Sequence, residues 1–357
     1  MTNNIFETVR IGRHELPHRL VMAPMTRSRA RCSLVDEVTA EYYEQRAGAA
    51  LIITEGTQPS PRGQGYIDTP GIHSAEQIAA WRKVTDAVHA KGGVIFQQLM
   101  HTGRIGHPYL YADGGLPEAP SAVASGMQLF TADQGLLDHP EPRELELDDI
   151  ARLIDEYTRA ARNSIEAGFD GVELHGANGY LIHQFLSGNT NRRTDAYGGP
   201  VENRIRFAVE LVQSVADAIG ADRLGIRVSP GNTYNNMAEE DSAELYAALT
   251  EALAPYGLAY IHVLETSRRD ITEQIRRDWP TAVILNPAEK PLEEAGGHAS
   301  ALLEAGLADA VSYARLWLAN PDAHRRVRAG APLNQDDPDS YYGGDHRGYT
   351  DYPALAD

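Results

Sequence analysis

The 357-residue chain lacks features that would place it in several protein classes: it has one cysteine, no long apolar run and fewer basic than acidic side chains. Because the single thiol, Cys32, has no second cysteine to pair with, an internal disulfide framework and a multi-cysteine metal site are excluded. No stretch approaches the ~18 consecutive apolar residues of a transmembrane helix, and the polar start has no signal-peptide pattern. We therefore expect a cytoplasmic protein with no membrane partner.

The net charge of the chain indicates which class of partner it binds. The sequence has 32 Lys and Arg against 50 Asp and Glu, which gives a formal charge of −18. Such a chain repels nucleic-acid phosphates and acidic membrane surfaces, so a small molecule is the expected partner and nucleic acid is not. The composition leaves monomer and homo-oligomer both open.

Eight short apolar segments alternate with amphipathic stretches along the chain. This count predicts an α/β fold in which a (β/α)₈ (TIM) barrel forms one domain over residues 1–357. An open doubly wound sheet is the alternative, but it usually has fewer strands and a switch point. The predicted strands are 20–22, 51–54, 94–99, 171–175, 225–228, 260–263, 282–285 and 310–312, and helices are expected at 76–89, 148–167, 201–219 and 239–254.

Two segments lie outside this alternation. Residues 6–18 alternate apolar and polar side chains around Gly12 and predict a hairpin that closes the barrel floor. Residues 103–142 are rich in Gly and Pro and too long for a simple connection. We expect them to form an excursion after the third strand that lies over the barrel mouth.

One known motif is present but is disrupted by a proline, and several others are absent. The run His14-Glu15-Leu16-Pro17-His18 matches the zinc-peptidase pattern HExxH, which works only on a helix, and Pro17 disfavours a helix there. No metal site is therefore expected. The patterns GxGxxG after a strand, GxxxxGK[ST] and GxSxG are absent, which disfavours a Rossmann domain, a P-loop and a serine hydrolase. A nicotinamide, if used, would bind without a domain of its own.

Arg227 stands in an apolar predicted strand between Ile226 and Val228. A buried guanidinium without a partner is prohibitively costly, so Arg227 must meet an anion or an electron-rich acceptor. An internal ion pair with Glu173 on the neighbouring predicted strand is the alternative.

His175 ends the fourth predicted strand and Asn178 and Tyr180 follow it, at the end of the barrel where an enzyme gathers its active site. His175 and Asn178 are three residues apart, so one helical turn would place them side by side as a two-donor clamp for a carbonyl oxygen. The Tyr180 phenol could supply a proton. Ordinary loop-capping polar groups are the alternative explanation for these residues.

Longer strings carry a resemblance to a known family. They are VMAPMTRS at 21–28, IITEG at 52–56, TPGIHS at 69–74, QLMHTGR at 98–104, HGANGYL at 175–181, RRTDAYGG at 192–199, ANPD at 319–322 and GYTDYP at 348–353. In this order, and over almost the whole chain, they resemble the Old Yellow Enzyme family of flavin-dependent ene reductases.

The resemblance implies a TIM barrel that holds FMN over its mouth, takes electrons from NADPH or NADH and passes them to an activated alkene. The Thr26 hydroxyl would lie near a ring carbonyl, and Arg227 would stabilise the anionic reduced ring. The cofactor-binding residues implied by the resemblance are Ala23, Pro24, Met25, Thr26, Gly56, Gln98, Arg227, Ala314 and Arg315.

The resemblance also assigns substrate roles. His175 and Asn178 would hold the electron-withdrawing group while hydride passes from flavin N5 to the β-carbon, and Tyr180 would then protonate the α-carbon. Tyr66, Tyr349 and Met237 are implied to line the pocket. Met100 lines it as well, where many relatives have a bulky Trp, which implies a roomier pocket.

One departure concerns the FMN phosphate. The family has a Gly-Gly pair after the seventh strand, whose N–H groups hold the phosphate, but residues 285–290 read LNPAEK here. Pro287 has no N–H to donate, and Glu289 adds negative charge. The eighth strand has Tyr313-Ala314 in place of Phe-Gly, while Arg315 and Lys290 remain as cations.

Two functions follow from this sequence. The first is an FMN enzyme that reduces the C=C bond of α,β-unsaturated carbonyl or nitro compounds with NAD(P)H. The second is a flavin-independent barrel of the same family that performs an isomerisation, cyclisation or elimination by acid–base chemistry in a specialised pathway. The first predicts yellow protein and the second predicts colourless protein.

Overall fold

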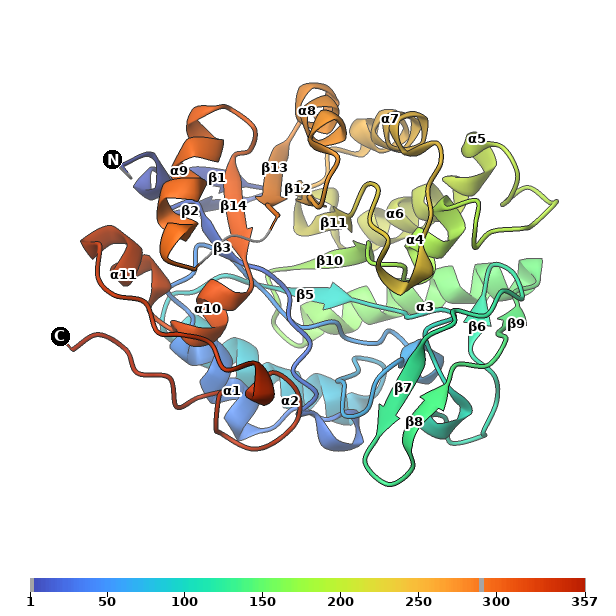
Figure 1. The fold of residues 1–357 in the computed structure, drawn as a ribbon, viewed down its shortest axis with the longest axis horizontal. Coiled ribbons are helices and arrows are strands. Elements are labelled where there is room, and N and C mark those ends of the chain that lie inside the picture. The colour runs from blue at the N-terminus through green and yellow to red at the C-terminus, as the bar shows by residue number, and fades with distance from the viewer. Residues whose placement is uncertain (1–2, 289–291, 357) are drawn as a thin grey trace.

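The computed structural model describes residues 3–288 and 292–356. In these residues eight parallel strands close into a barrel in the order β10-β11-β12-β13-β14-β3-β4-β5, which confirms the predicted TIM barrel (Figure 1). The strands are β3 (Leu20–Met22), β4 (Ile52–Ile53), β5 (Ile95–Leu99), β10 (Gly171–Gly176), β11 (Leu224–Val228), β12 (Tyr260–Leu264), β13 (Ala282–Asn286) and β14 (Ala310–Tyr313).

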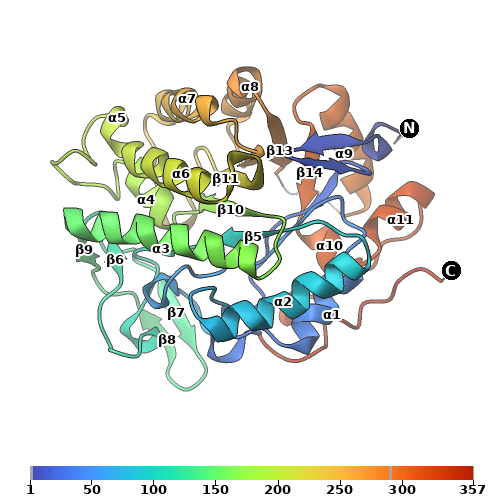
Figure 2. The same ribbon diagram turned by 180° about the vertical axis from the view of Figure 1, so that it is seen from behind.

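Each barrel strand is followed by at least one helix, and Figure 2 shows α2, α3 and α6 crossing the outside of the barrel. The helices are α1 (Glu37–Gln45), α2 (Ala75–Ala90), α3 (Leu147–Glu166), α4 (Leu181–Leu186), α5 (Val201–Arg204), α6 (Arg206–Ile219), α7 (Ser242–Leu253), α8 (Arg269–Asp278), α9 (Ala295–Glu304), α10 (Arg315–Ala319) and α11 (Ala323–Ala329). None of the helices in the described part of the chain is long and apolar enough to span a membrane.

The predicted helices agree with α2 and α3 to within one residue at each end. Ser74 starts α2 as a capping box, in which its side chain accepts from the Gln77 backbone and the Gln77 side chain accepts in return. The helix expected at 201–219 is divided at Ile205 into α5 and α6. The helix expected at 239–254 begins only at Ser242, because the Glu239 side chain takes part in buried contacts described below.

The predicted hairpin is β1 (Val9–Ile11) and β2 (His14–Leu16), joined through Gly12 at φ +56°. His14 therefore lies in a strand, so the HExxH string does not form the helix that zinc binding would need. The hairpin closes the floor by packing on a layer of interior apolar side chains. This layer comprises Ile11, Leu16, Val21, Ile53, Phe96, Tyr260, Ile284 and Ala310.

Above the apolar floor the barrel interior becomes polar. Strand register aligns His175 with Arg227 and Arg227 with His262, so side chains of β10, β11 and β12 reach the same level. Hydrogen bonds across the interior link strands that are not neighbours: His262 bonds Glu173 on one side and Ser312 on the other. The carboxyl half of the barrel is thus arranged for polar chemistry.

The predicted excursion after the third barrel strand is also present. It contains the short parallel pair β6 (Glu118–Ala119) and β9 (Arg143–Glu144), and the antiparallel hairpin β7 (Gln128–Thr131) and β8 (Gly135–Asp138) (Figure 1). Leu129 and Phe130 of β7 line the cavity at the barrel mouth. The excursion therefore forms part of the wall of the site.

The C-terminal segment returns to the first barrel strand and passes beside α1 (Figure 1). The Arg27 guanidinium donates to the backbone oxygens of Tyr341 and Gly348 at 2.9 and 2.7 Å. The Tyr349 ring stacks on Tyr42 with centroids 4.1 Å apart. These contacts fix the end of the chain at the rim of the barrel.

Candidate active site

A cavity of about 650 Å³ opens at the carboxyl ends of the barrel strands. Its walls come from the segment after β3, the loop after β4, the excursion, the ends of β5, β10, β11 and β14, and the C-terminal segment. Twelve of the predicted site residues line it: Pro24, Met25, Thr26, Tyr66, Gln98, Met100, His175, Asn178, Tyr180, Arg227, Ala314 and Arg315.

Two predicted cofactor residues lie outside the cavity lining. Ala23 is fully buried, and its N–H donates to the Tyr313 carbonyl at 3.0 Å, so it serves the barrel wall. A Cβ on Gly56 would lie 2.5 Å from Met100 Cε, so the absence of a side chain at Gly56 lets Met100 pack there. Gly56 therefore shapes the cavity through Met100.

Tyr349 and Met237 also differ from the expectation that they line the pocket. The Tyr349 ring is buried against Tyr42, and the cations of Arg27 and Arg29 lie 5.0 and 4.5 Å from its centroid. It is held away from the cavity by these contacts and stabilises the C-terminal segment. Met237 is buried with its sulfur 4.0 Å from an Arg104 nitrogen, behind the cavity wall.

His175 is the last but one residue of β10, and Asn178 follows in a left-handed turn at φ +57°. The expected helical turn between them is therefore absent, although both side chains reach the cavity. The Ala177 N–H donates to His175 Nδ1 at 3.3 Å, which leaves the ring hydrogen on Nε2. Burial, with a smaller contribution from Arg227, holds the pKa of His175 well below its usual value, so the ring is neutral.

Asn178 has its amide orientation set by a neighbour. Asn232 Nδ2 donates to Asn178 Oδ1 at 2.8 Å, which leaves Asn178 Nδ2 as the group with free donors. The neutral His175 and the Asn178 amide thus provide two uncharged donors at one wall of the cavity. This is the arrangement that polarises a carbonyl or nitro oxygen.

Tyr180 lies next to these donors, and its ring meets the His175 ring edge-on with centroids 4.9 Å apart. Its hydroxyl oxygen is 2.9 Å from that of Tyr66. Burial raises the pKa of Tyr180 above its ordinary value, and it raises the pKa of Tyr66 in the same way. Both phenols therefore carry their protons at neutral pH and can donate them.

Arg227 is not paired directly with Glu173, which was the alternative to a ligand. Its Nη1 lies 3.0 and 2.8 Å from the two His262 nitrogens, its Nη2 donates to Asn286 Oδ1 at 2.7 Å, and Glu173 contacts His262 Nδ1 at 2.8 Å. Burial and Arg227 lower the pKa of His262 to about 4, so that ring is neutral, and the positive charge of the pair is carried by Arg227. Across the described residues, the Arg227 Nε–H is buried without a hydrogen-bond partner.

Glu173 also orients a cavity residue. Gln98 Nε2 donates to Glu173 Oε1 at 2.7 Å, so the Gln98 oxygen is turned away from that carboxylate. The polar side chains beneath the cavity therefore hold the Arg227 guanidinium in place and fix the direction of the Gln98 amide.

Arg315, predicted to hold a phosphate, lines the cavity but has a carboxylate partner. Its Nε and Nη2 donate to Asp336 at 2.7 and 2.9 Å, and the Tyr341 hydroxyl donates to the same carboxylate. The Asp336 side chain is only 4% exposed. Pro287, which follows β13 directly, has no N–H to offer. Glu289 and Lys290, named above for this end of the site, lie outside the described residues.

The sequence analysis missed several aromatic and apolar residues of the cavity. Leu129 and Phe130 come from the excursion, Tyr234 from the loop after β11, and Tyr341 and Tyr342 from the C-terminal segment. Phe130, Tyr234 and Tyr342 are exposed by 62%, 53% and 68%. Exposed aromatic side chains at a cavity mouth are a recognisable feature of ligand sites, but loop residues carry no periodic pattern that would reveal them.

Comparison with known proteins shows the family to which the chain belongs. The sequence profile of the NADH:flavin oxidoreductase / NADH oxidase family matches residues 4–334. The chain belongs to this family, the Old Yellow Enzymes. 12-Oxophytodienoate reductase 1 of Oryza sativa subsp. japonica is 42% identical over 357 residues, which cover 97% of this chain and 92% of that protein. 12-Oxophytodienoate reductase 2 of Arabidopsis thaliana is 38% identical over 361 residues, with 97% and 94% covered.

Solved structures of the same family share the fold in detail. Morphinone reductase matches with a TM-score of 0.95 and 41% identity over 99% of this chain and 96% of that one. The Old Yellow Enzyme homologue of Zymomonas mobilis matches with a TM-score of 0.94 and 38% identity over 99% and 100%. This Old Yellow Enzyme is thus an FMN oxidoreductase of the ene-reductase type.

The residues of this Old Yellow Enzyme fit FMN at the ring end. The cavity volume of about 650 Å³ lies within the ~300–1,000 Å³ range of small-molecule sites. Arg227 is a buried cation that lines the cavity, and the electron-rich pyrimidine edge of a flavin suits such a group. At the phosphate end the chain offers Arg315, whose charge is shared with Asp336.

Proposed function

We propose that this protein reduces the C=C bond of α,β-unsaturated carbonyl or nitro compounds at the cavity described above. The observation that carries the proposal is the meeting of two neutral donors, His175 and Asn178, with the protonated phenol of Tyr180 at one wall. Such a wall suits a substrate that has an electron-withdrawing oxygen and a carbon that must gain a proton.

FMN, when bound, supplies hydride chemistry between a reduced nicotinamide and the alkene. His175 and Asn178 donate hydrogen bonds to the substrate oxygen and so draw electron density from the β-carbon, which becomes the hydride acceptor. Tyr180 holds its proton for the α-carbon, so hydride and proton together saturate the double bond. Arg227 and Gln98 bind the ring edge, and the fixed positive charge of Arg227 favours the electron-rich form of the cofactor.

The relatives support this class of substrate. 12-Oxophytodienoate reductase and morphinone reductase are both named as reductases of oxo compounds. Morphinone reductase has been seen in complex with tetrahydroNAD. A nicotinamide bound at the same mouth would explain why the chain has no dinucleotide-binding domain of its own.

The test is an absorption spectrum followed through both half-reactions. We expect yellow protein after loading with FMN, loss of the flavin absorbance with NADPH or NADH, and rapid recovery with 2-cyclohexenone in the absence of oxygen. Cyclohexanone is the control, because it keeps the carbonyl but has no C=C bond. Recovery that is no faster with the enone than with cyclohexanone would refute the proposal.

The flavin-independent alternative predicts the opposite result, an absorption spectrum without a flavin band. It requires protein that stays colourless after incubation with FMN, and the buried Arg227 cation in the cavity wall argues against it. The altered phosphate end is the observation that would favour it, so the loading step of the experiment tests this point directly.

A further inference from the structure

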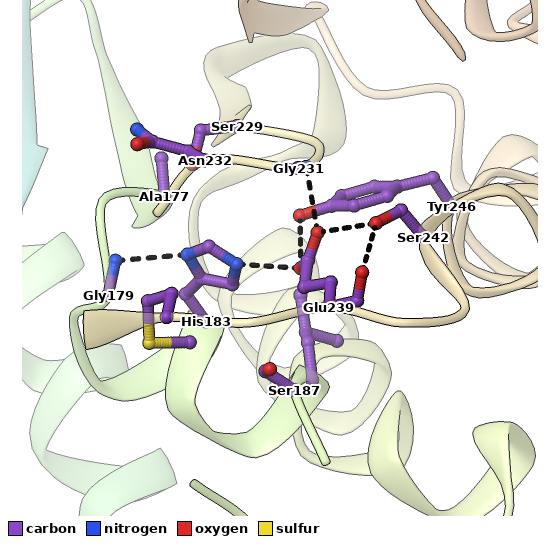
Figure 3. A network of polar contacts seen from close by, with 12 residues as sticks. Ala177, Gly179, His183, Ser187, Ser229, Gly231, Asn232, Glu239, Ser242 and Tyr246 are labelled. Atoms are coloured by element: carbon purple, nitrogen blue, oxygen red, sulfur yellow. Dashed lines mark hydrogen bonds and ion pairs between the residues drawn. The ribbon is translucent and has the colours of Figure 1, made fainter. Parts of the chain in front are cut away.

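A buried hydrogen bond between a histidine and a glutamate lies behind the cavity wall, between α4 and the loop that precedes α7 (Figure 3). His183 Nε2 and Glu239 Oε1 are 2.7 Å apart, and both side chains are 0% exposed. Neither residue lines the cavity. Their contacts therefore act on the site only through other residues.

Glu239 is surrounded by donors. Its Oε1 accepts from His183 and from the Tyr246 hydroxyl at 3.0 Å, and its Oε2 accepts from the Gly231 N–H at 2.8 Å and the Ser242 hydroxyl at 3.1 Å (Figure 3). Burial alone would raise the pKa of Glu239, but these hydrogen bonds hold it below its ordinary value. The carboxylate is thus an anion with all its acceptor sites in use.

One arm of this network reaches the backbone beside Asn178. The Gly179 N–H donates to His183 Nδ1 at 2.9 Å, so the His183 hydrogen must lie on Nε2 and point at Glu239. Asn178 and Gly179 both have positive φ, at +57° and +74°. Glycine adopts this conformation freely but asparagine does so at a cost, and the His183 contact with the Gly179 N–H helps to hold the turn.

The other arm reaches the Asn178 side chain. Glu239 Oε2 holds the Gly231 N–H, and the next residue, Asn232, donates to Asn178 Oδ1 at 2.8 Å. This second contact turns the Asn178 Nδ2 hydrogens away from Asn232. Glu239 therefore supports Asn178 from two directions, through the main chain and through the amide.

We propose that Glu239 is a positioning residue that fixes Asn178 as a hydrogen-bond donor to the substrate oxygen, acting through His183 on one side and Gly231-Asn232 on the other. The inference rests on the proposed function, because it assumes that Asn178 binds that oxygen. Nothing in the contacts of Glu239 with Tyr246 or Ser242 is needed for this role.

The experiment measures binding of 4-nitrophenolate, an anionic oxygen acceptor, to the FMN-loaded protein by calorimetry. Glu239→Gln keeps the size of the side chain, but a carboxamide has one oxygen and cannot accept from both His183 and Gly231. We expect the dissociation constant to rise about tenfold, the range for one hydrogen bond to a charged group. Tyr246→Phe is the matched control: Glu239 loses one donor but keeps both arms, so we expect less than about a twofold change.

A double variant separates positioning from general destabilisation. Asn178→Ala should itself raise the dissociation constant, and adding Glu239→Gln should raise it no further, because the group that Glu239 positions is gone. Effects that multiply in the double variant would overturn the inference. So would an unchanged constant in Glu239→Gln when Asn178→Ala binds more weakly.

The two proposals fail in different ways. If Asn178→Ala binds 4-nitrophenolate as tightly as the unaltered protein, the donor clamp itself is wrong and the Glu239 inference falls with it. If Glu239→Gln yields no folded holoenzyme, Asn232→Ala tests the second arm by removing the side chain that donates to Asn178 Oδ1. We expect the same weakening there, and an unchanged constant would overturn the inference.

Discussion

The hydroxyl oxygens of Tyr66 and Tyr180 lie 2.9 Å apart in the cavity wall, and one phenol donates to the other. Because burial raises the pKa of both groups, neither ionises at neutral pH. A proton that leaves Tyr180 therefore has a second phenol next to it from which it can be replaced. This pairing places the acid of the proposed reaction beside the substrate donors.

Tyr180→Phe should slow alkene reduction about a hundredfold, which is the lower end of the range of rate losses for removal of a general acid. Flavin reduction by the nicotinamide should be nearly unchanged. Stopped-flow absorbance measures the two half-reactions separately. Tyr66→Phe removes only the neighbour of the acid and should have a smaller effect on alkene reduction. Equal losses in both half-reactions of Tyr180→Phe would refute the assigned proton transfer.

Asp336→Asn should strengthen the binding of FMN relative to riboflavin, which lacks the phosphate. The Asp336 carboxylate shares the Arg315 cation that a phosphate would use, and two like charges ~4 Å apart repel by ~1 kcal/mol even in water, which is about fivefold in affinity. Quenching of flavin fluorescence gives both dissociation constants. Asp339→Asn makes the same change at an exposed position nearby and should leave the ratio unchanged. If Asp336 instead orients Arg315 for the phosphate, the ratio will fall.

Glu55→Gln should alter how stability depends on pH. Burial raises the pKa of Glu55 to about 7, so the folded state holds a proton that the unfolded chain has released above its ordinary pKa near 4.5. Stability therefore falls as pH rises from about 4.5 to 7 and levels off above, a loss on the order of 3 kcal/mol.

Denaturant unfolding of both proteins at pH 5 and pH 8 measures this effect. Between pH 5 and pH 8 the free energy of unfolding should drop less in Glu55→Gln than in the unaltered protein. The two drops should differ by an amount on the order of 3 kcal/mol. Equal drops in the two proteins would show that Glu55 titrates near its ordinary value in the folded state.

Tyr349→Ala should destabilise the fold by about 3–5 kcal/mol, the usual range for removing a fully buried aromatic side chain. The ring is stacked on Tyr42 and lies beneath two arginines, so its loss leaves a cavity and two weakly held cations. Tyr342→Ala, seven residues earlier, removes a ring that is 68% exposed and should change stability by less than about 0.5 kcal/mol. Urea denaturation of both variants decides the comparison, and equal effects would contradict the packing described here.

Local patterns in the sequence predicted most of the barrel and the strand-end residues of the site. The apolar strand on either side of it predicted that Arg227 is buried, and His175 was predicted from its position at the end of β10. Spacing alone was misleading for Asn178, because a separation of three residues was interpreted as a helical turn and the chain adopts left-handed conformations there. Backbone conformation in such a turn depends on partners that are distant in sequence.

Other features depend on contacts between distant segments and have no local pattern. The start of α7 was predicted too early because the Glu239 carboxylate bonds His183, which is 56 residues away. Tyr349 is turned away from the cavity because its ring stacks on Tyr42, which lies near the other end of the chain. The aromatic rim formed by Phe130, Tyr234 and Tyr342 comes from three separate loops. Residues of this kind are found only when the folded chain brings them together.

The attachment of the C-terminal segment to Arg27 has a consequence for synthesis of the protein. Tyr341 and Tyr342 complete the cavity wall, and they follow all eight barrel strands in the chain. A nascent barrel whose other strands have already closed still lacks this part of the wall and the carbonyls that hold Arg27. Ligand binding with full affinity therefore needs residues that are synthesised after every barrel strand, and a chain that stops short of this segment has an open site.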